Sequence, residues 1–218
     1  MPQNVRGELT TPEKYFSDIP LTEEELHNKV ILCERQIVNS PVENVLVFDE
    51  CGNIIVHLIG NQKVVNLPMK YWNAAKVITH NHPDGATLSA VDVSQIFRTP
   101  VDELRAVSGD VWYSVKRGEN CTKQAQTVLS ELSKHLHEND YYAVKDICDK
   151  NGILVEIDSE KGMCRTAKPK DMDYAEYLDL REKSIKESSI LRILRLHQAL
   201  SDYAEKNDII YTFGVLKP

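Results

Sequence analysis

The chain has 218 residues, a formal net charge of −7 and a hydrophobic fraction of 42%, which fit a soluble protein with a real core. The acidic balance argues against binding to a nucleic-acid backbone, and no apolar run predicts a membrane span or a signal peptide. The five cysteines form no Cys-x-x-Cys pair, so we expect reduced thiols in a cytoplasmic protein.

The first predicted elements follow a polar N-terminal arm, residues 1–20, which we expect to be flexible. Thr22 and Glu25 form a capping-box pattern, and apolar residues follow at helical spacing, which predicts a helix that ends near Val38. Glycines at the intervening turns separate short apolar runs. These runs predict three strands, over residues 43–48, 54–59 and 63–67.

The remaining chain alternates between strand and helix patterns, which indicates an α/β protein. The expected elements are a strand over 76–79, a helix after 92, a hairpin over 104–108 and 111–115, helices over 122–136 and 141–148, and a strand over 153–157. Residues 162–170 are expected to form a loop, residues 174–205 to be helical, and residues 209–213 to form a last strand. We therefore expect a main domain over residues 21–158 and a mainly helical C-terminal extension over 159–218. That extension could cover the core, form a homodimer or bind a partner protein.

The most informative segment contains two histidines, a serine and an aspartate. His80 and His82 are two residues apart, so on an extended chain their imidazoles point to the same side. Asp92 follows after a Pro/Gly-containing turn. Two imidazoles and a carboxylate are the ligand set of a catalytic zinc site that keeps one position open for water. Taken alone, Ser89-x-x-Asp92 would also fit a simple helix capping box.

This segment resembles a known family. The stretch from His80 to Gly85 reads His-Asn-His-Pro-Asp-Gly and is followed by Ser89-x-x-Asp92, which is similar to the signature of the JAMM/MPN (JAB) zinc metalloprotease superfamily and its RadC-like and phage-type branches. The resemblance covers about residues 40–117. The loop between His82 and Ser89 is one residue shorter than in the common eukaryotic pattern. The resemblance implies a JAB/MPN-like core, with the layers of a cytidine-deaminase-like fold and a curved mixed sheet flanked by helices.

The resemblance also implies a chemical role for each residue. His80, His82 and Asp92 would hold Zn²⁺, and Ser89 would donate a hydrogen bond to the oxyanion. A glutamate upstream would take a proton from water and pass it to the leaving amine. Glu43, just before an apolar strand, is the best match for this base, and Glu50 in the following turn is the alternative.

The leading hypothesis is therefore a zinc-dependent peptidase or isopeptidase that acts on a protein or peptide, with a ubiquitin-like conjugate among the substrates that the family suggests. One alternative is a non-catalytic JAB-like scaffold or assembly module of phage or defence origin. Another is a RadC-like protein associated with DNA, which the acidic composition disfavours. The zinc content of the purified protein would separate the enzyme from the scaffold.

Overall fold

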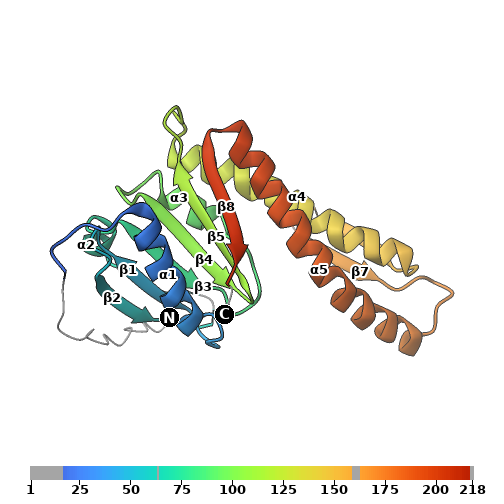
Figure 1. The fold of residues 1–218 in the computed structure, drawn as a ribbon. Helices are drawn as coiled ribbons and strands as arrows, with labels where there is room; N and C mark the ends of the chain where they lie inside the picture. The colour runs from blue at the N-terminus through green and yellow to red at the C-terminus, as the bar shows by residue number, and fades with distance from the viewer. Residues whose placement is uncertain (1–16, 63, 159–162, 217–218) are drawn as a thin grey trace. The chain divides into compact units, whose positions relative to one another are not determined.

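A computed structural model describes residues 17–62, 64–158 and 163–216 of the chain (Figure 1). The expected N-terminal arm thus lies outside the described residues except for residues 17–20. The elements are α1 (Glu23–Ile37), β1 (Asn44–Phe48), β2 (Ile54–Ile59), α2 (Met69–Trp72), β3 (Val77–Asn81), α3 (Ala90–Gln95), β4 (Glu103–Ser108), β5 (Val111–Arg117), α4 (Ala125–Lys150), β6 (Leu154–Asp158), β7 (Met163–Ala167), α5 (Tyr174–Lys206) and β8 (Ile209–Val215).

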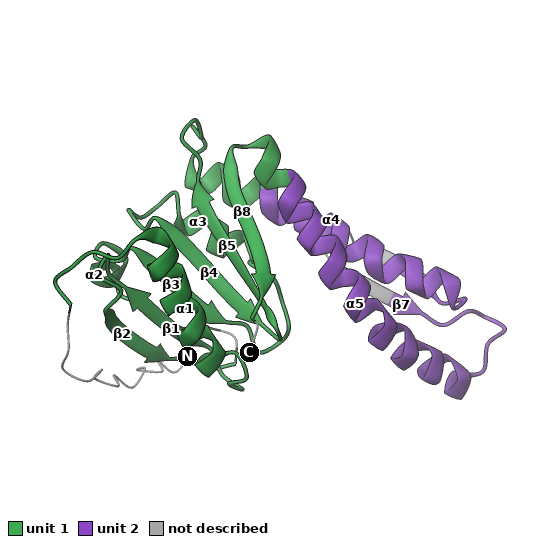
Figure 2. Cartoon of the chain, in the orientation of Figure 1, with its two compact units in different colours: residues 1–131, 203–218 green, residues 132–202 purple. Residues whose placement is uncertain are grey.

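The chain divides into two compact units, residues 1–131 with 203–218, and residues 132–202 (Figure 2). In the first unit a six-stranded sheet has the order β2-β1-β3-β4-β5-β8. Its β3–β4 pair is parallel and its other pairs are antiparallel, so the sheet is mixed. The prediction of an α/β fold with a mixed sheet and flanking helices is confirmed at this level. The last strand, β8, pairs with β5 and so belongs to this sheet.

Helices α1 and α3 lie on opposite faces of the sheet. Thr79 on β3 donates a hydrogen bond to Glu34 of α1, whereas the next residue, His80, faces Asp92 of α3. Successive side chains of a strand point to opposite faces, so these two contacts assign each helix to its face. The α1 face is closed by an apolar cluster that includes Leu26, Val30, Ile37, Leu46 and Phe48.

Several local predictions are confirmed. The Thr22–Glu25 capping box is present, and α1 ends at Ile37 with Val38 as its C-cap. The predicted hairpin is the β4–β5 pair, and Gly109 in its turn has a φ of +55°, a conformation that glycine adopts without a Cβ clash. The Ser89–Asp92 capping box is present as well, at the start of α3.

The strand expected over residues 63–67 is wrong for residues 64–67, and Lys63 lies outside the described residues. The chain turns sharply there, because the backbone N–H of Asn61 donates to the Val64 carbonyl and the Asn61 side chain accepts from the Val64 N–H. A Cβ placed on Gly60 would lie 2.4 Å from the Val64 carbonyl oxygen, so only glycine allows this close return of the chain. The apolar run therefore packs beside the sheet instead of extending it.

Two further expectations are corrected in the C-terminal half of the chain. Residues 122–136 and 141–148 do not form separate helices, because the polar residues between them include no Gly or Pro and α4 continues from Ala125 to Lys150. Residues 163–167 form β7, which pairs with β6, where a loop was expected. The expected helical segment over residues 174–205 is confirmed and forms one helix, α5. It packs on α4 through the Arg192–Asp140 and Arg195–Asp146 ion pairs.

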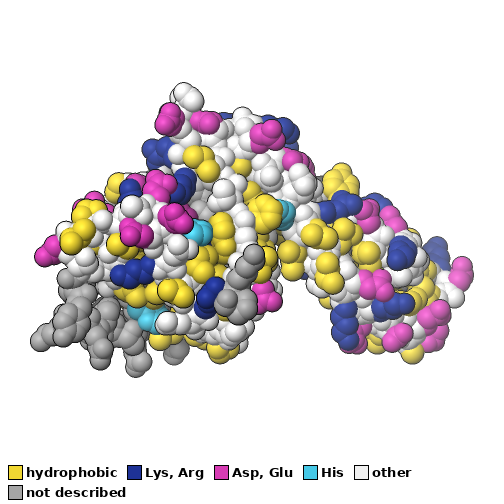
Figure 3. All heavy atoms as spheres, in the orientation of Figure 1, with side chains coloured by type: hydrophobic (Ala, Val, Ile, Leu, Met, Phe, Trp, Pro, Cys, Tyr) yellow, Lys and Arg dark blue, Asp and Glu magenta, His cyan; other side chains and the backbone are white. Residues whose placement is uncertain are grey.

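The surface of the described residues carries both signs of charge. On the face of the molecule seen in Figure 3, acidic and basic side chains are interspersed and do not gather into one basic patch. A patch of that kind would be needed to follow a nucleic-acid backbone. No helix among the described residues combines the length and the apolar character needed to cross a bilayer.

Candidate metal centre

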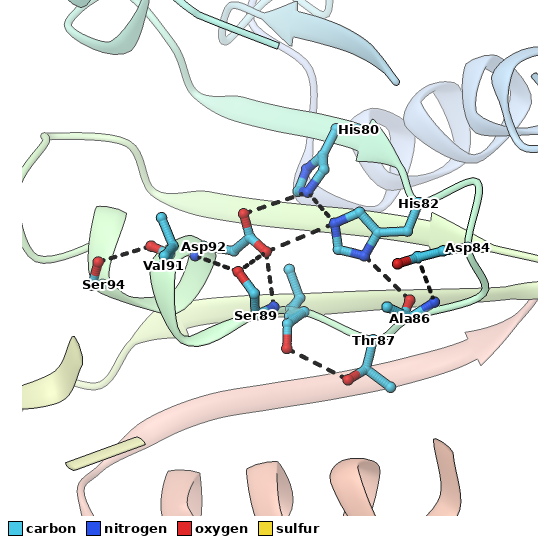
Figure 4. A network of polar contacts seen from close by, with 10 residues as sticks. His80, His82, Asp84, Ala86, Thr87, Ser89, Val91, Asp92 and Ser94 are labelled. Carbon is cyan, nitrogen blue, oxygen red and sulfur yellow. Dashed lines mark hydrogen bonds and ion pairs between the residues drawn. The ribbon is translucent and has the colours of Figure 1, made fainter. Parts of the chain in front are cut away.

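Three predicted ligands converge at the end of β3. His80 lies on β3, His82 lies just beyond the end of β3, and Asp92 lies in the first turn of α3 (Figure 4). The two Nε2 atoms are 2.8 Å apart, His80 Nε2 is 3.5 Å from Asp92 Oδ1, and His82 Nε2 is 3.8 Å from Asp92 Oδ2. The three side chains form a group that could hold a metal ion.

The sheet and the helix cap together produce this convergence. His80 is paired with Val45 on one side and Ala106 on the other, and the His82 N–H donates to the Val107 carbonyl. The strand geometry is thus maintained through both histidines, which places both imidazoles on one face. The tight loop that follows includes Gly85 at a φ of +84°.

Asp92 is oriented by the helix cap. Its Oδ2 accepts hydrogen bonds from the Ser89 N–H at 2.8 Å and the Ser89 hydroxyl at 2.6 Å, while the Asp92 N–H donates to Ser89 Oγ. The capping box and the ligand set therefore use the same carboxylate. Burial alone would raise the pKa of Asp92, but His80, His82 and the two Ser89 hydrogen bonds hold that pKa below its ordinary value.

Each imidazole also has a backbone partner. His82 Nδ1 lies 3.2 Å from the Ala86 carbonyl oxygen, and the His80 ring interacts with the backbone of Arg105. A ring that donates to the backbone through one nitrogen would present its other nitrogen to a metal ion. Burial lowers the pKa of His80 to about 4, so this ring is neutral near pH 7.

The spacing of the donor atoms fits a small tetrahedral ion. Ligand atoms roughly 2.0–2.1 Å from a tetrahedral zinc are about 3.3 Å from one another. The 2.8 Å distance joins the two Nε2 atoms, and the 3.5 and 3.8 Å distances join these atoms to Oδ1 and Oδ2 of Asp92; the values lie on both sides of that spacing. The contact between the two imidazole nitrogens is a hydrogen bond when one of them carries a proton, and a metal ion bound here would replace that proton.

The candidate site opens into a pocket of about 590 Å³. Glu43, Ser89 and the three ligands line it, together with an apolar wall that includes Val45, Val64, Val65, Leu67, Trp72, Ile78 and Leu104. The mispredicted run 64–67 thus forms part of this wall. Glu50, the alternative to Glu43, lies in the turn after β1 and is not among the described residues that line the pocket.

Glu43 lies directly before β1, where its backbone pairs with the β2 side of the sheet through Gly60 and Asn61. Burial raises the pKa of its carboxyl group, and the negative charges of Asp92 and Asp84 raise it further. The nearby His82 and the backbone N–H of Val65 act in the opposite direction. The net result is a carboxyl group whose pKa lies above its ordinary value.

A buried ion pair supports the ligands from the opposite face of the sheet, and the sequence analysis missed it. Glu34 of α1 accepts hydrogen bonds from Thr79, which precedes His80, and from the side chain of Arg105. The backbone of Arg105 also interacts with the His80 ring. The available signal was a charged residue on an apolar surface: Glu34 follows Val30 by four residues and precedes Ile37 by three on α1, and Arg105 lies between Leu104 and Ala106 on β4.

Comparison of the chain with protein-family models, curated proteins and solved structures found no match. The functional interpretation therefore rests on the geometry of this pocket and on the motif in the sequence.

Proposed function

We propose that the protein is a zinc-dependent metallopeptidase of the JAMM/MPN (JAB) type that hydrolyses a peptide or isopeptide bond. One observation carries the proposal. The imidazoles of His80 and His82 and the Asp92 carboxylate bring one possible ligand atom each within 4.8 Å of one another, in the wall of a pocket that Glu43 also lines. Two imidazoles and one carboxylate leave a fourth position for water, as catalytic zinc sites do.

The residues of the pocket would divide the reaction among them. A bound zinc ion would lower the pKa of a water molecule and polarise the scissile carbonyl. Glu43 would accept the proton of that water and deliver it to the leaving amine, a task that its raised pKa suits. Ser89 would donate a hydrogen bond to the oxyanion after its hydroxyl turns away from Asp92, to which it donates now.

The pocket is compatible with a polypeptide substrate. Its volume of about 590 Å³ lies within the range of ligand sites, and its apolar wall faces the ligand group. The side chains next to the scissile bond would pack against Val65 and Trp72, both of which line the pocket. A protein, a free peptide or a conjugate of a ubiquitin-like modifier could each supply such a segment.

Metal content and hydrolysis, measured together, test the proposal. Protein expressed with zinc should contain about one zinc per chain by mass spectrometry, and His82→Ala should lose it. The wild-type protein should cleave members of a mixed peptide library or a ubiquitin-like conjugate. Glu43→Gln should abolish this cleavage with zinc still bound, and the matched change Glu50→Gln should leave it intact.

The alternative outcomes are distinct. A chain that takes up no zinc when zinc is supplied would favour an assembly module over an enzyme. Hydrolysis that survives in Glu43→Gln would show that another group acts as the base.

A further inference from the structure

Asn81 lies between the two histidine ligands but points away from them. It is fully buried, and by strand alternation its side chain lies on the face opposite to the imidazoles of His80 and His82. Its backbone belongs to β3 and pairs with Val107 of β4, so its side chain links this strand to the residues that it contacts.

All three hydrogen-bond partners of the Asn81 amide surround Glu43 in the chain. The amide oxygen accepts from the Asn44 N–H at 2.7 Å, and the amide nitrogen donates to the Val42 carbonyl at 3.1 Å and the Ser40 carbonyl at 3.3 Å. Asn44 and Val42 are the two residues next to Glu43. The Asn81 side chain is therefore hydrogen-bonded to the backbone on both sides of Glu43, the candidate base.

These side-chain hydrogen bonds begin where the backbone pairing of β1 with β3 ends. The β1–β3 register ends with Val45 opposite His80, and its continuation by two residues would place Glu43 opposite His82. The backbone of Glu43 itself pairs with the β2 side, through Gly60 and Asn61. On the β3 side, residues 42–44 are hydrogen-bonded to the Asn81 side chain, through the Asn44 N–H and the Val42 carbonyl.

Residues 40–44 are also hydrogen-bonded to one another. The Asn44 amide nitrogen donates to Ser40 Oγ at 2.8 Å and to the Val42 carbonyl at 2.9 Å, and its oxygen lies 2.9 Å from His57 Nε2. Because these contacts connect residues 40–44 to one another, we expect the segment to move as a unit. Its position relative to β3 then depends on its hydrogen bonds to Asn81.

We propose that Asn81 is a positioning residue that sets the distance between Glu43 and the metal ligands. The inference rests on the proposed function, because it concerns the base of that reaction. Asparagine suits the task because its amide offers an acceptor and two donors, whereas Ser is too short to reach both sides of Glu43. A displacement of a reacting group by about 1 Å can lower a rate by roughly a hundredfold.

A double-mutant cycle on ligand binding tests the proposal without relying on turnover. Acetohydroxamic acid chelates zinc, and its hydroxyl can hydrogen-bond to a nearby carboxylate. Its affinity for the zinc-loaded protein, measured by calorimetry, should fall about tenfold in Glu43→Gln and to a similar extent in Asn81→Ala. Because Asn81 acts through Glu43, the double variant should bind no more weakly than Glu43→Gln alone.

A matched control separates positioning from a general loss of stability. Asn53 is also buried, and its side chain bridges Ser17 and Asp49 at the other end of β1. Asn53→Ala should lower the melting temperature and leave hydroxamate affinity unchanged. Asn81→Ala should keep its zinc, and where peptide hydrolysis is measurable its kcat should fall about a hundredfold with KM within about twofold of wild type.

Three outcomes for the folded variants would overturn the inference. Wild-type affinity in Asn81→Ala, additive losses in the double variant, or loss of zinc from Asn81→Ala would show that Asn81 does not act by placing Glu43. If Asn81→Ala does not fold, Asn81→Ser is used in the same cycle with the same expected result. A wild-type protein that binds zinc and hydroxamate but cleaves no peptide refutes the proposed function, and the cycle still decides the role of Asn81. A chain that binds no zinc refutes both.

Discussion

Removal of the buried Glu34 carboxylate should be among the most destabilising single changes in the sheet domain. Glu34 is fully buried and accepts from Thr79 Oγ1 at 2.7 Å, from Arg105 Nε at 2.7 Å and from Arg105 Nη2 at 2.8 Å. Glu34→Ala would leave the Arg105 guanidinium, only 1% exposed, with Glu103 as its remaining carboxylate partner.

Two independent estimates of the cost agree. Two charge-assisted hydrogen bonds at about 1.5–3 kcal/mol each give about 3–6 kcal/mol, and breaking a buried ion pair typically costs about 3–5 kcal/mol. Domains of this kind have a total unfolding free energy of about 5–15 kcal/mol, so Glu34→Ala should remove about a fifth of it or more. Guanidinium chloride denaturation at pH 7, with zinc held at one fixed concentration, measures this loss.

Two further variants sharpen the test. Gln36→Ala, an exposed change on the same helix, should alter the free energy of unfolding by less than about 0.5 kcal/mol. The double change Glu34→Met with Arg105→Met removes both desolvated charges and should recover most of the loss. A cost below about 1 kcal/mol for Glu34→Ala would refute the reasoning, because it would mean that Glu103 or water fully satisfies Arg105.

Three other changes have defined outcomes. Ser89→Ala removes the cap of α3 and should lower the free energy of unfolding by about 1 kcal/mol in denaturation. If Ser89 stabilises the oxyanion, kcat should also fall about 10²–10³-fold with zinc retained. An unchanged kcat would show that Ser89 takes no part in the chemistry. Gly85→Ala places a Cβ on a residue with a φ of +84° and should lower the free energy of unfolding by about 1–2 kcal/mol. Zinc affinity should fall as well, because the next residue, Ala86, carries the carbonyl beside His82 Nδ1. The control Gly109→Ala, at a φ of +55° with no atom near the added Cβ, should lower stability alone. The pKa of Glu103 lies below its ordinary value of 4.5, because the Arg105 guanidinium outweighs the opposite effect of burial. A lowered carboxyl pKa stabilises the fold above that ordinary value, so the free energy of unfolding should fall as the pH drops below 4.5. Glu103→Gln should flatten this fall in a pH series of denaturation curves.

Much of the candidate site could be predicted because its parts are local in sequence. His80, His82 and Asp92 come from one short strand–loop–helix segment, and the alternation of a strand and the geometry of a helix cap suffice to bring them together. The capping boxes at Thr22 and Ser89 were predictable for the same reason, since each involves residues three apart.

The elements that could not be predicted depend on distant partners. Residues 64–67 have the apolar composition of a strand, but the turn at Asn61 and the close approach at Gly60 leave them without a strand to pair with. Residues 163–167 look like a loop and become β7 because β6 supplies their hydrogen bonds. Pairing free energy comes from the neighbouring strand, so composition alone does not decide whether a strand forms.

The sequence by itself determined the ligand set and the local geometry that presents it. Only the tertiary structure decided what surrounds that set. The β1–β3 register brings Glu43 to the pocket, Asn81 holds the backbone on either side of it, and Glu34 meets Arg105 from 71 residues away. These contacts follow from strand order and from which face each side chain takes, and no local pattern carries that information.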